Sequence, residues 1–352
     1  MRVVHVIEGL PRTAGTTVFP IEVAREQLAL GHEVEIVHFT FNDCADSGVR
    51  IRRVESLDEL GYRPDIVHMH AFWSLCQVRA MRWCRQHGVP YVVSPHGGLM
   101  PRVLRKGWLK KHLFFWVFVK PALKKAAVLH CTGEGERTAV EALGIRTRTF
   151  TVPLGCRLPV GSEVKVKGEG EQRMVLFLGR LGEEKGLELL LEAWKEIQTT
   201  SGKLVLAGPS WQGYGEKLRE KVEVEKIGGV EFAGPADEAM KDRLYRAADV
   251  FVLSSPMENF SLVVLEALAY GAPVICTKGT PWKGIAEQDC GWWIDYTRES
   301  FVRALKDALE ASDEKLGEMG ARARALAGTY DWRRVAERLT GLYLNRAEGA
   351  CS

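Results

Sequence analysis

The chain has 352 residues, of which 46% are hydrophobic and 26% charged, a length and composition that indicate a globular protein of two domains. A formal net charge of +3 does not by itself indicate a nucleic-acid-binding protein. The scattered cysteines form no C-x-x-C pair and no metal-ligand spacing, so we expect reduced thiols and no zinc site. No apolar run approaches the roughly 18 residues of a transmembrane helix, and MRVVHVIEGL is typical of a first strand rather than a signal peptide. We therefore expect a cytoplasmic protein.

Short apolar strands alternate with amphipathic helices along the chain, which predicts α/β domains with parallel sheets covered on both faces. The periodicity is lost between Pro159 and Arg173, a charged, glycine-rich stretch that we interpret as an inter-domain linker and hinge. We expect domains at 1–160 and 172–330, with a helix at about 332–348 packing back on the first. The expected strands are Val3–Ile7, Glu33–Phe39, Ile66–Met69, Tyr91–Ser94, Ala127–Cys131 and Phe150–Leu154, then Met174–Leu178, Leu204–Ala207, Val230–Phe232, Val250–Leu253, Val274–Cys276 and Trp292–Ile294.

The turn after the first strand, GLPRTAGTTVFP, suits a close approach of backbone to a ligand. Gly9 and Gly15 remove the steric barrier, and Thr16 or Thr17 can cap the helix that follows. The turn is not G-x-G-x-x-G, and no acid about 20 residues further on would hold an adenosine ribose. Dinucleotide binding is therefore disfavoured.

Three histidines follow on later strands of the first half. His68 and His70 end the strand in DIVHMH, where a structural role is the commoner outcome for a single histidine. His96 directly precedes two glycines in SPHGG, which places a polar ring beside permissive backbone at a strand end. We favour a functional role for His96.

Residues 102–125 are basic and aromatic, with no acidic side chain between Gly98 and Glu134. This composition is typical of an interfacial helix on an anionic membrane surface. A core helix with a solvated outer face explains it equally well, and the two interpretations stay open. Nucleic acid is a poorer third choice because nothing else in the chain extends the patch.

The second half carries two cations and two acids near strand ends. Arg180 and Lys185 lie in the turn before a helix expected near Gly186, which suits a phosphate. The alternative is that both pair with the neighbouring acids at 183 and 184. Glu258 follows the strand in ADVFVLSS and precedes a helix opening near 260–261, at the end of the sheet where ligands bind. Glu266 lies in an apolar run, where its carboxylate needs a hydrogen-bonding partner such as a backbone N–H or a structural arginine.

The sequence resembles the retaining nucleotide-sugar glycosyltransferases of family four, which have the GT-B fold, over nearly its whole length. The resemblance depends on GHEV, DIVHMH, SPHGG, LHCTGEGE, VPLG, GRLGEEKG, the two acids eight positions apart in ENFSLVVLE, and the closing helix from Trp332. The combination of GR-x4-KG with Glu-x7-Glu is highly specific. TPWKGIAEQDCGWWID is similar to bacterial members that build surface polysaccharides. The resemblance implies two Rossmann-like, doubly wound domains facing a central cleft.

The resemblance also implies roles for individual residues. Arg180 and Lys185 would neutralise the donor diphosphate, Glu266 would bind the nucleotide ribose, and Glu258 would lie near the transferred sugar. Three positions depart from the family pattern, Ala14, Leu154 and Ser255, of which the first would alter the acceptor side and the others only packing. The remaining implied residues are His96 near the donor sugar, Gly179, Asn259, Phe260, Ser261 and Gly15 on the donor side, and His70, Ala14 and Thr16 on the acceptor side.

From this resemblance we expect a metal-independent, retaining transfer of a hexose-type sugar from a UDP- or GDP-sugar to a glycan or lipid-linked acceptor. No cofactor is expected, because the nucleotide sugar is a substrate and no D-x-D acid cluster is present. The enzyme would be cytoplasmic and could lie on the inner face of the cell membrane. A nucleotide-sugar 2-epimerase and a non-catalytic nucleotide-sugar-binding module are the two alternatives.

Overall fold

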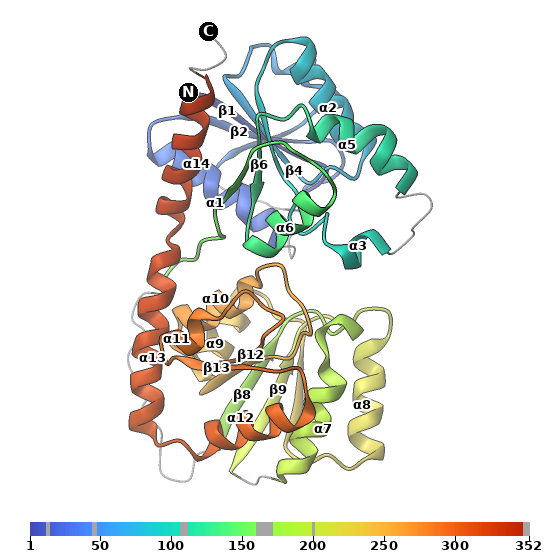
Figure 1. Cartoon of the computed structure of the whole chain (residues 1–352). Helices are drawn as coiled ribbons and strands as arrows, with labels where there is room; N and C mark the ends of the chain where they lie inside the picture. The colour runs from blue at the N-terminus through green and yellow to red at the C-terminus, as the bar shows by residue number, and fades with distance from the viewer. Residues whose placement is uncertain (12–14, 44–47, 106–111, 160–171, 199–200, 348–352) are drawn as a thin grey trace. The chain divides into compact units, whose positions relative to one another are not determined.

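The computed structural model describes residues 1–11, 15–43, 48–105, 112–159, 172–198 and 201–347. The chain divides into two compact units (Figure 1). Unit 1 comprises Met1–Gly155 with Tyr330–Ser352, and unit 2 comprises Cys156–Thr329. Most of the expected linker, residues 160–171, lies outside the described residues.

Unit 1 is built on a parallel sheet of seven strands in the order β3-β2-β1-β4-β5-β6-β7. Strand β3 was not expected from the sequence, because arginine occupies three of the four positions in RIRR and leaves no apolar run at this sheet edge. Strand β7 ends earlier than expected, before Pro153, which has no N–H to donate to a neighbouring strand. The strands are β1 (Arg2–Ile7), β2 (Glu33–His38), β3 (Arg50–Arg53), β4 (Ile66–His70), β5 (Tyr91–Ser94), β6 (Val128–Cys131) and β7 (Thr149–Thr151).

Helices cover both faces of this sheet because successive strand residues point to opposite sides. Val4 and Val6 belong to a core formed with α2 and α5, whereas Val3 and Ile7 belong to a core formed with α1 and α14. Helix α14 closes the unit by packing on α1, the first helix of the chain (Figure 1). The helices are α1 (Gly15–Ala29), η1 (Leu57–Leu60), α2 (Leu75–Gln86), α3 (Pro101–Arg105), η2 (Phe115–Val119), α5 (Lys120–Leu123), α6 (Glu134–Ala142) and α14 (Trp332–Ala347).

Unit 2 repeats the arrangement with six parallel strands in the order β10-β9-β8-β11-β12-β13. Helix α7 packs against α8 and α12, and α10 packs against α13 (Figure 1). The strands are β8 (Arg173–Leu178), β9 (Gly202–Ala207), β10 (Val230–Gly234), β11 (Val250–Leu253), β12 (Val274–Thr277) and β13 (Gly291–Ile294). The helices are η3 (Glu183–Lys185), α7 (Leu187–Ile197), α8 (Tyr214–Val224), α9 (Glu238–Ala247), α10 (Leu262–Ala269), α11 (Gly284–Glu287), α12 (Arg298–Glu310), α13 (Asp313–Ala327) and η4 (Gly328–Tyr330).

The strand order reverses once in each sheet, between β1 and β4 in unit 1 and between β8 and β11 in unit 2. In open α/β sheets, ligands bind beyond the carboxyl ends of the strands at such a reversal. The expected fold class of two parallel-sheet α/β domains is confirmed. Across the described residues, no helix combines the length and the apolar character needed to cross a bilayer.

Candidate functional site

The turn after β8 lies directly against the carboxyl end of β11. Gly186 caps α7 with a φ of 65°, and a Cβ atom on it would lie only 2.4 Å from the carbonyl oxygen of Ser254. A side chain at 186 is therefore excluded by both backbone conformation and space. The hydroxyl of Ser254 donates a hydrogen bond of 2.7 Å to the carbonyl oxygen of Lys185, which fixes the turn to the neighbouring strand.

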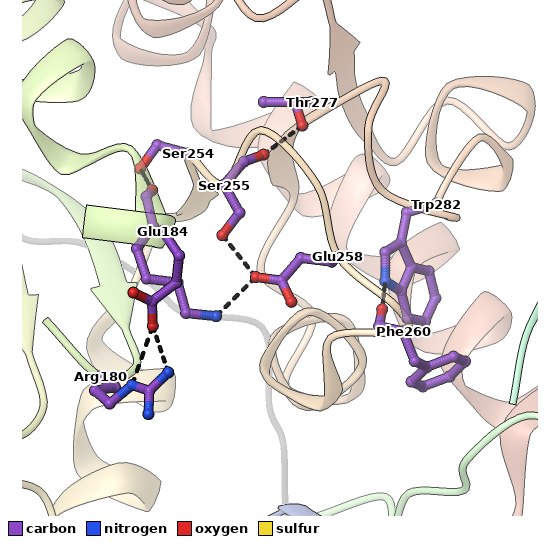
Figure 2. A network of polar contacts seen from close by, with 9 residues as sticks. Arg180, Glu184, Ser254, Ser255, Glu258, Phe260, Thr277 and Trp282 are labelled. Carbon is purple, nitrogen blue, oxygen red and sulfur yellow. Dashed lines mark hydrogen bonds and ion pairs between the residues drawn. The ribbon is translucent and has the colours of Figure 1, made fainter. Parts of the chain in front are cut away.

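Lys185 and Glu258, two of the residues expected to act on a ligand, meet at this point. Nζ of Lys185 donates to Oε1 of Glu258 over 2.7 Å, and each side chain is only 18% exposed (Figure 2). The hydroxyl of Ser255 donates to the same oxygen over 2.6 Å, and Thr277 donates to the carbonyl oxygen of Ser255. The expectation that Ser255 affects only packing is therefore wrong, since its hydroxyl positions the Glu258 carboxylate.

Arg180 is held differently. Its guanidinium pairs with the carboxylate of Glu184 four residues later (Figure 2). The guanidinium also lies 4.7 Å from the ring centre of Trp211. The alternative interpretation, pairing with a neighbouring acid of the turn, describes Arg180 in the structure but not Lys185. The Arg180 side chain is 46% exposed, whereas that of its partner Glu184 is only 16% exposed.

The loop between β11 and α10 leaves the amino end of α10 without a side-chain cap. Ser261, the cap residue, has a φ of 72°, and its buried hydroxyl has no hydrogen-bond partner among the described residues. Such a conformation costs a non-glycine residue about 1–3 kcal/mol and is concentrated at functional sites. The indole N–H of Trp282 donates to the carbonyl oxygen of Phe260 over 2.5 Å and holds the loop in place (Figure 2). Uncapped N–H groups at a helix start suit an anion.

Glu266 is half-buried on the second turn of α10, and its partner is a tyrosine. The hydroxyl of Tyr245, on α9, donates to Oε2 of Glu266 over 2.7 Å. Burial raises the pKa of the Glu266 carboxyl, and Lys241 and the Tyr245 hydrogen bond offset part of that rise. The expected partners, a backbone N–H or an arginine, were wrong because Tyr245 comes from another helix, which local sequence does not reveal.

In unit 1, His96 lies at the carboxyl end of β5 in a constrained loop. Its φ is 49° and that of Gly97 is 76°, so two successive residues have the left-handed conformation. The N–H of Gly97 donates to Oε1 of Glu136, and the N–H of Thr132 donates to Oε2 over 2.8 Å. The buried Glu136 carboxylate thus holds the His96 loop, a role that the motif around it did not indicate.

His70, placed on the acceptor side, contacts His96 directly, with 3.1 Å between Nδ1 of His70 and Nε2 of His96. Gly15 and Thr16 begin α1, and Ala14 lies outside the described residues. Because α1 begins at Gly15, Thr16 and Thr17 both lie within its first turn. The expectation that one of them precedes and caps this helix is therefore wrong.

Known proteins match both units. Residues 14–155 match the family described as Glycosyl transferase 4-like domain, and residues 162–326 match Glycosyl transferases group 1. A D-inositol 3-phosphate glycosyltransferase of Jonesia denitrificans is 27% identical over 95% of this chain and 92% of its own length. An uncharacterized glycosyltransferase of Methanocaldococcus jannaschii is also 27% identical, over 65% of this chain and 62% of its own length. The match to some relatives thus spans less than two thirds of their own length.

Solved structures match this chain over both units. Sucrose-phosphate synthase from Thermosynechococcus elongatus has a TM-score of 0.80 at 20% identity and covers 100% of both chains. HepE of Anabaena, in complex with UDP and glucose, has a TM-score of 0.79 at 17% identity and covers 98% of this chain and 100% of its own. At such identities the likeness shows the fold, which is GT-B.

Proposed function

The chain belongs to the group 1 glycosyl transferases, and we propose that it transfers a hexose-type sugar from a nucleotide-sugar donor to a glycan or lipid-linked acceptor with retention of configuration. The observation that carries the proposal is the Lys185–Glu258 pair at the strand-order reversal of unit 2. This pair places a cation and a carboxylate side by side beyond the sheet, beside the uncapped start of α10. The cation and the helix N–H groups can bind a diphosphate, whereas the carboxylate can accept hydrogen bonds from sugar hydroxyls.

The chemistry follows from where charge develops. When the bond between the sugar and the diphosphate breaks, negative charge builds on the leaving phosphate while the sugar becomes oxocarbenium-like. Lys185, Arg180 and the start of α10 stabilise that charge without proton transfer. The acceptor hydroxyl attacks from the face that the nucleotide leaves and passes its proton to the departing diphosphate oxygen, which retains configuration and balances the transfer. Glu258 orients the sugar through its hydroxyls, and Glu266 binds the nucleotide ribose.

The donor is proposed to be a UDP- or GDP-sugar. HepE was solved with UDP and with glucose, which supports a nucleotide sugar as the kind of ligand for this fold. Thermal-shift measurements with UDP, GDP, ADP and their sugars identify the nucleotide, because a ligand that binds only the folded state raises the apparent stability. No metal ion takes part in the proposed reaction, and EDTA is therefore expected to leave the rate unchanged.

Hydrolysis of the donor and its transfer to a glycan acceptor test the proposal. Glu258→Gln keeps an acceptor for the Ser255 hydroxyl but removes the charge, and we expect it to lower kcat by about 10²- to 10³-fold. Glu223→Gln, on the exposed side of α8, is the matched control and keeps the wild-type rate. Full activity of Glu258→Gln would contradict the assigned site. Conversion of the nucleotide sugar to its 2-epimer without an acceptor would favour the epimerase instead.

An interaction with an anionic membrane surface is also proposed. Leu113, Trp116 and Phe118 are 67%, 53% and 45% exposed, while their neighbours Phe115 and Val119 are buried in the core. The outer side of residues 113–118 is therefore apolar, which the core-helix alternative does not explain. Lys120 lies 3.8 Å from the ring centre of Trp116, so a cation accompanies the aromatic face as at a headgroup boundary.

A further inference from the structure

The face of the unit 1 sheet that α1 and α14 cover carries a row of buried histidines. Strand alternation puts His5 on the same face as Val3 and Ile7, and His5 is directly opposite His68 in the β1–β4 register. His70 lies two residues further along β4, and His130 continues the row on β6. All four are buried. The sequence signal is a histidine in each of three otherwise apolar strands, β1, β4 and β6.

A continuous chain of hydrogen bonds joins two of these rings, those of His5 and His70, to His96. Nε2 of His5 lies 2.8 Å from Oε1 of Gln27, and Nδ1 of His5 lies 2.9 Å from Nε2 of His70. Nδ1 of His70 then lies 3.1 Å from Nε2 of His96. At its other end, the amide nitrogen of Gln27 donates to the hydroxyl of Thr340 on α14, so the amide oxygen faces His5.

The direction of every bond in this chain follows from the Gln27 amide oxygen, which only accepts. Nε2 of His5 must carry the hydrogen, so Nδ1 of His5 accepts from Nε2 of His70. By the same rule, Nδ1 of His70 accepts from Nε2 of His96. The rule requires one proton on each ring, which agrees with the effect of burial, because burial lowers the pKa of His5 to about 4 and of His96 to about 3.

A second chain supports the same logic. Nε2 of His130 lies 2.8 Å from the carbonyl oxygen of Val152, which can only accept, so Nδ1 of His130 accepts from Ser94. Ser94 in turn accepts from Nε2 of His68, whose Nδ1 accepts from the hydroxyl of Tyr343 over 2.5 Å. Both chains are complete with neutral rings, and both end on a group that cannot take up a proton.

We propose that Gln27, His5 and His70 are positioning residues that lock His96 in the tautomer with hydrogen on Nε2, leaving Nδ1 as a hydrogen-bond acceptor for a sugar hydroxyl. The structure records no partner for Nδ1 of His96 among the described residues. This inference rests on the proposed function for its ligand. Because the chain ends on an amide, His96 accepts a hydrogen bond but passes no proton inward. Nδ1 of His96 can therefore bind a ligand hydroxyl, which donates a hydrogen bond, but not a ligand group that can only accept one.

Nuclear magnetic resonance of ring-nitrogen-labelled histidine tests the tautomer without any activity assay. Two-bond proton–nitrogen spectra separate the two neutral tautomers and the imidazolium, and His96→Gln identifies the His96 signals by their loss. We expect His96 to show hydrogen on Nε2 alone, with the same pattern at pH 8 and pH 5. Hydrogen on Nδ1, or a doubly protonated ring, would overturn the proposal. Failure of the proposed function would appear separately, in the donor assay.

A matched pair of buried glutamines tests the origin of the lock. Gln27→Met removes the amide that ends the chain, and we expect the His96 signals to shift toward a mixture of tautomers. Gln77→Met removes a buried amide that donates to the backbone oxygen of His70 and not to its ring. This control is expected to keep the wild-type pattern. Equal patterns in both variants would show that Gln27 does not set the tautomer; if Gln27→Met does not fold, the wild-type spectrum decides.

A bound metal ion is the rival explanation for the histidine row. Nitrogen atoms of His5, His68 and His70 lie within 4.8 Å of one another, which is close enough for a shared ion. A metal would take the lone pairs that the hydrogen bonds use. We expect the histidine spectrum to be identical before and after dialysis against EDTA. A spectrum that changes with EDTA and is restored by zinc would assign these nitrogens to a metal. It would contradict the proposal that the hydrogen bonds fix the tautomer of His96.

Discussion

Nζ of Lys185 lies 2.7 Å from Oε1 of Glu258, although 73 residues separate the two in the sequence. The turn after β8 and the loop after β11 bring them together because those strands are neighbours at the reversal of strand order. The cation proposed for the phosphate therefore hydrogen-bonds the carboxylate proposed for the sugar. Neither charge is left alone in a site that is only partly open to solvent.

Lys185 is expected to govern the rate of transfer. Lys185→Ala removes the charge that stabilises the departing diphosphate, and we expect kcat/KM to fall by about 10²- to 10³-fold. Steady-state kinetics with the nucleotide sugar identified by thermal shift measures the effect. Lys217→Ala removes an exposed lysine that bonds Glu188, and it is the control that keeps the wild-type rate. An equal, small loss in both variants would contradict the role.

Glu266→Gln is expected to weaken nucleotide binding while making the fold more stable at neutral pH. The loss of a charged hydrogen bond to the ribose costs about 1.5–3 kcal/mol, or roughly 10- to 150-fold in Kd. Because burial raises the pKa of Glu266, the folded state binds more protons than the unfolded chain above the ordinary pKa of 4.5. The free energy of unfolding of the wild type therefore decreases as the pH rises through the raised pKa. The variant has no carboxyl group at this position, so it does not show this decrease.

Urea unfolding and nucleotide titration at several pH values measure the two effects of Glu266→Gln. The stability advantage of the variant is expected to shrink toward zero as the pH falls below 4.5, where both chains carry a neutral group. Tyr245→Phe is the companion variant, because it removes the hydroxyl that donates to Glu266 but keeps the charge. Lower stability of Glu266→Gln at neutral pH would contradict the explanation.

Acid is expected to destabilise unit 1 through its buried histidines. Burial lowers the pKa of His5 and His130 to about 4 and of His96 to about 3, against 6.5 in the unfolded chain. Between pH 6.5 and about 4 the unfolded chain therefore binds more protons than the folded chain. As the pH decreases through this range, the free energy of unfolding falls by about 1.4 kcal/mol per pH unit for each such histidine. Urea unfolding at pH 7.5, 6.5, 5.5 and 4.5 measures the slope.

The control for this slope separates titration from packing. Val93→Ala, at a buried position of β5, lowers the free energy of unfolding by a similar amount at every pH and leaves the slope unchanged. His130→Gln removes one titrating group and makes the slope shallower. A wild-type stability that is constant from pH 7.5 to pH 5 would contradict the neutral, buried state of the histidines.

Binding to anionic vesicles is expected to depend on the exposed apolar face around Trp116. The triple variant Leu113→Ser, Trp116→Ser and Phe118→Ser should lower the fraction that sediments with phosphatidylglycerol vesicles by about tenfold or more, since burying one such side chain gains about 1.5–3 kcal/mol. Val224→Ser, at a side chain of α8 that is 74% exposed, is the control. Equal sedimentation of wild type, triple variant and control would exclude this surface.

Much of the fold could be predicted from short-range patterns of apolar residues in the sequence. Strands β5 and β11 begin and end at the expected residues, because runs of apolar side chains between turn residues mark buried strands directly. The edge strand β3 could not be predicted in this way, since it pairs with β2 but has no run of apolar side chains. The short strand β7 shows the same limit, because a proline rather than periodicity sets its end.

The order of residues also located Lys185, Glu258, Glu266 and His96 at helix starts and strand ends, because local periodicity and helix-start signals place a side chain within its own element. It did not reveal which partner each would meet. Glu258 bonds Lys185, and Glu266 bonds Tyr245, across 73 and 21 positions of the chain. Those pairings depend on strand order and helix packing, which join distant segments through nonlocal contacts that no short window of sequence contains. The buried chain from Gln27 to His96 likewise exists only once β1, β4 and α1 have packed together.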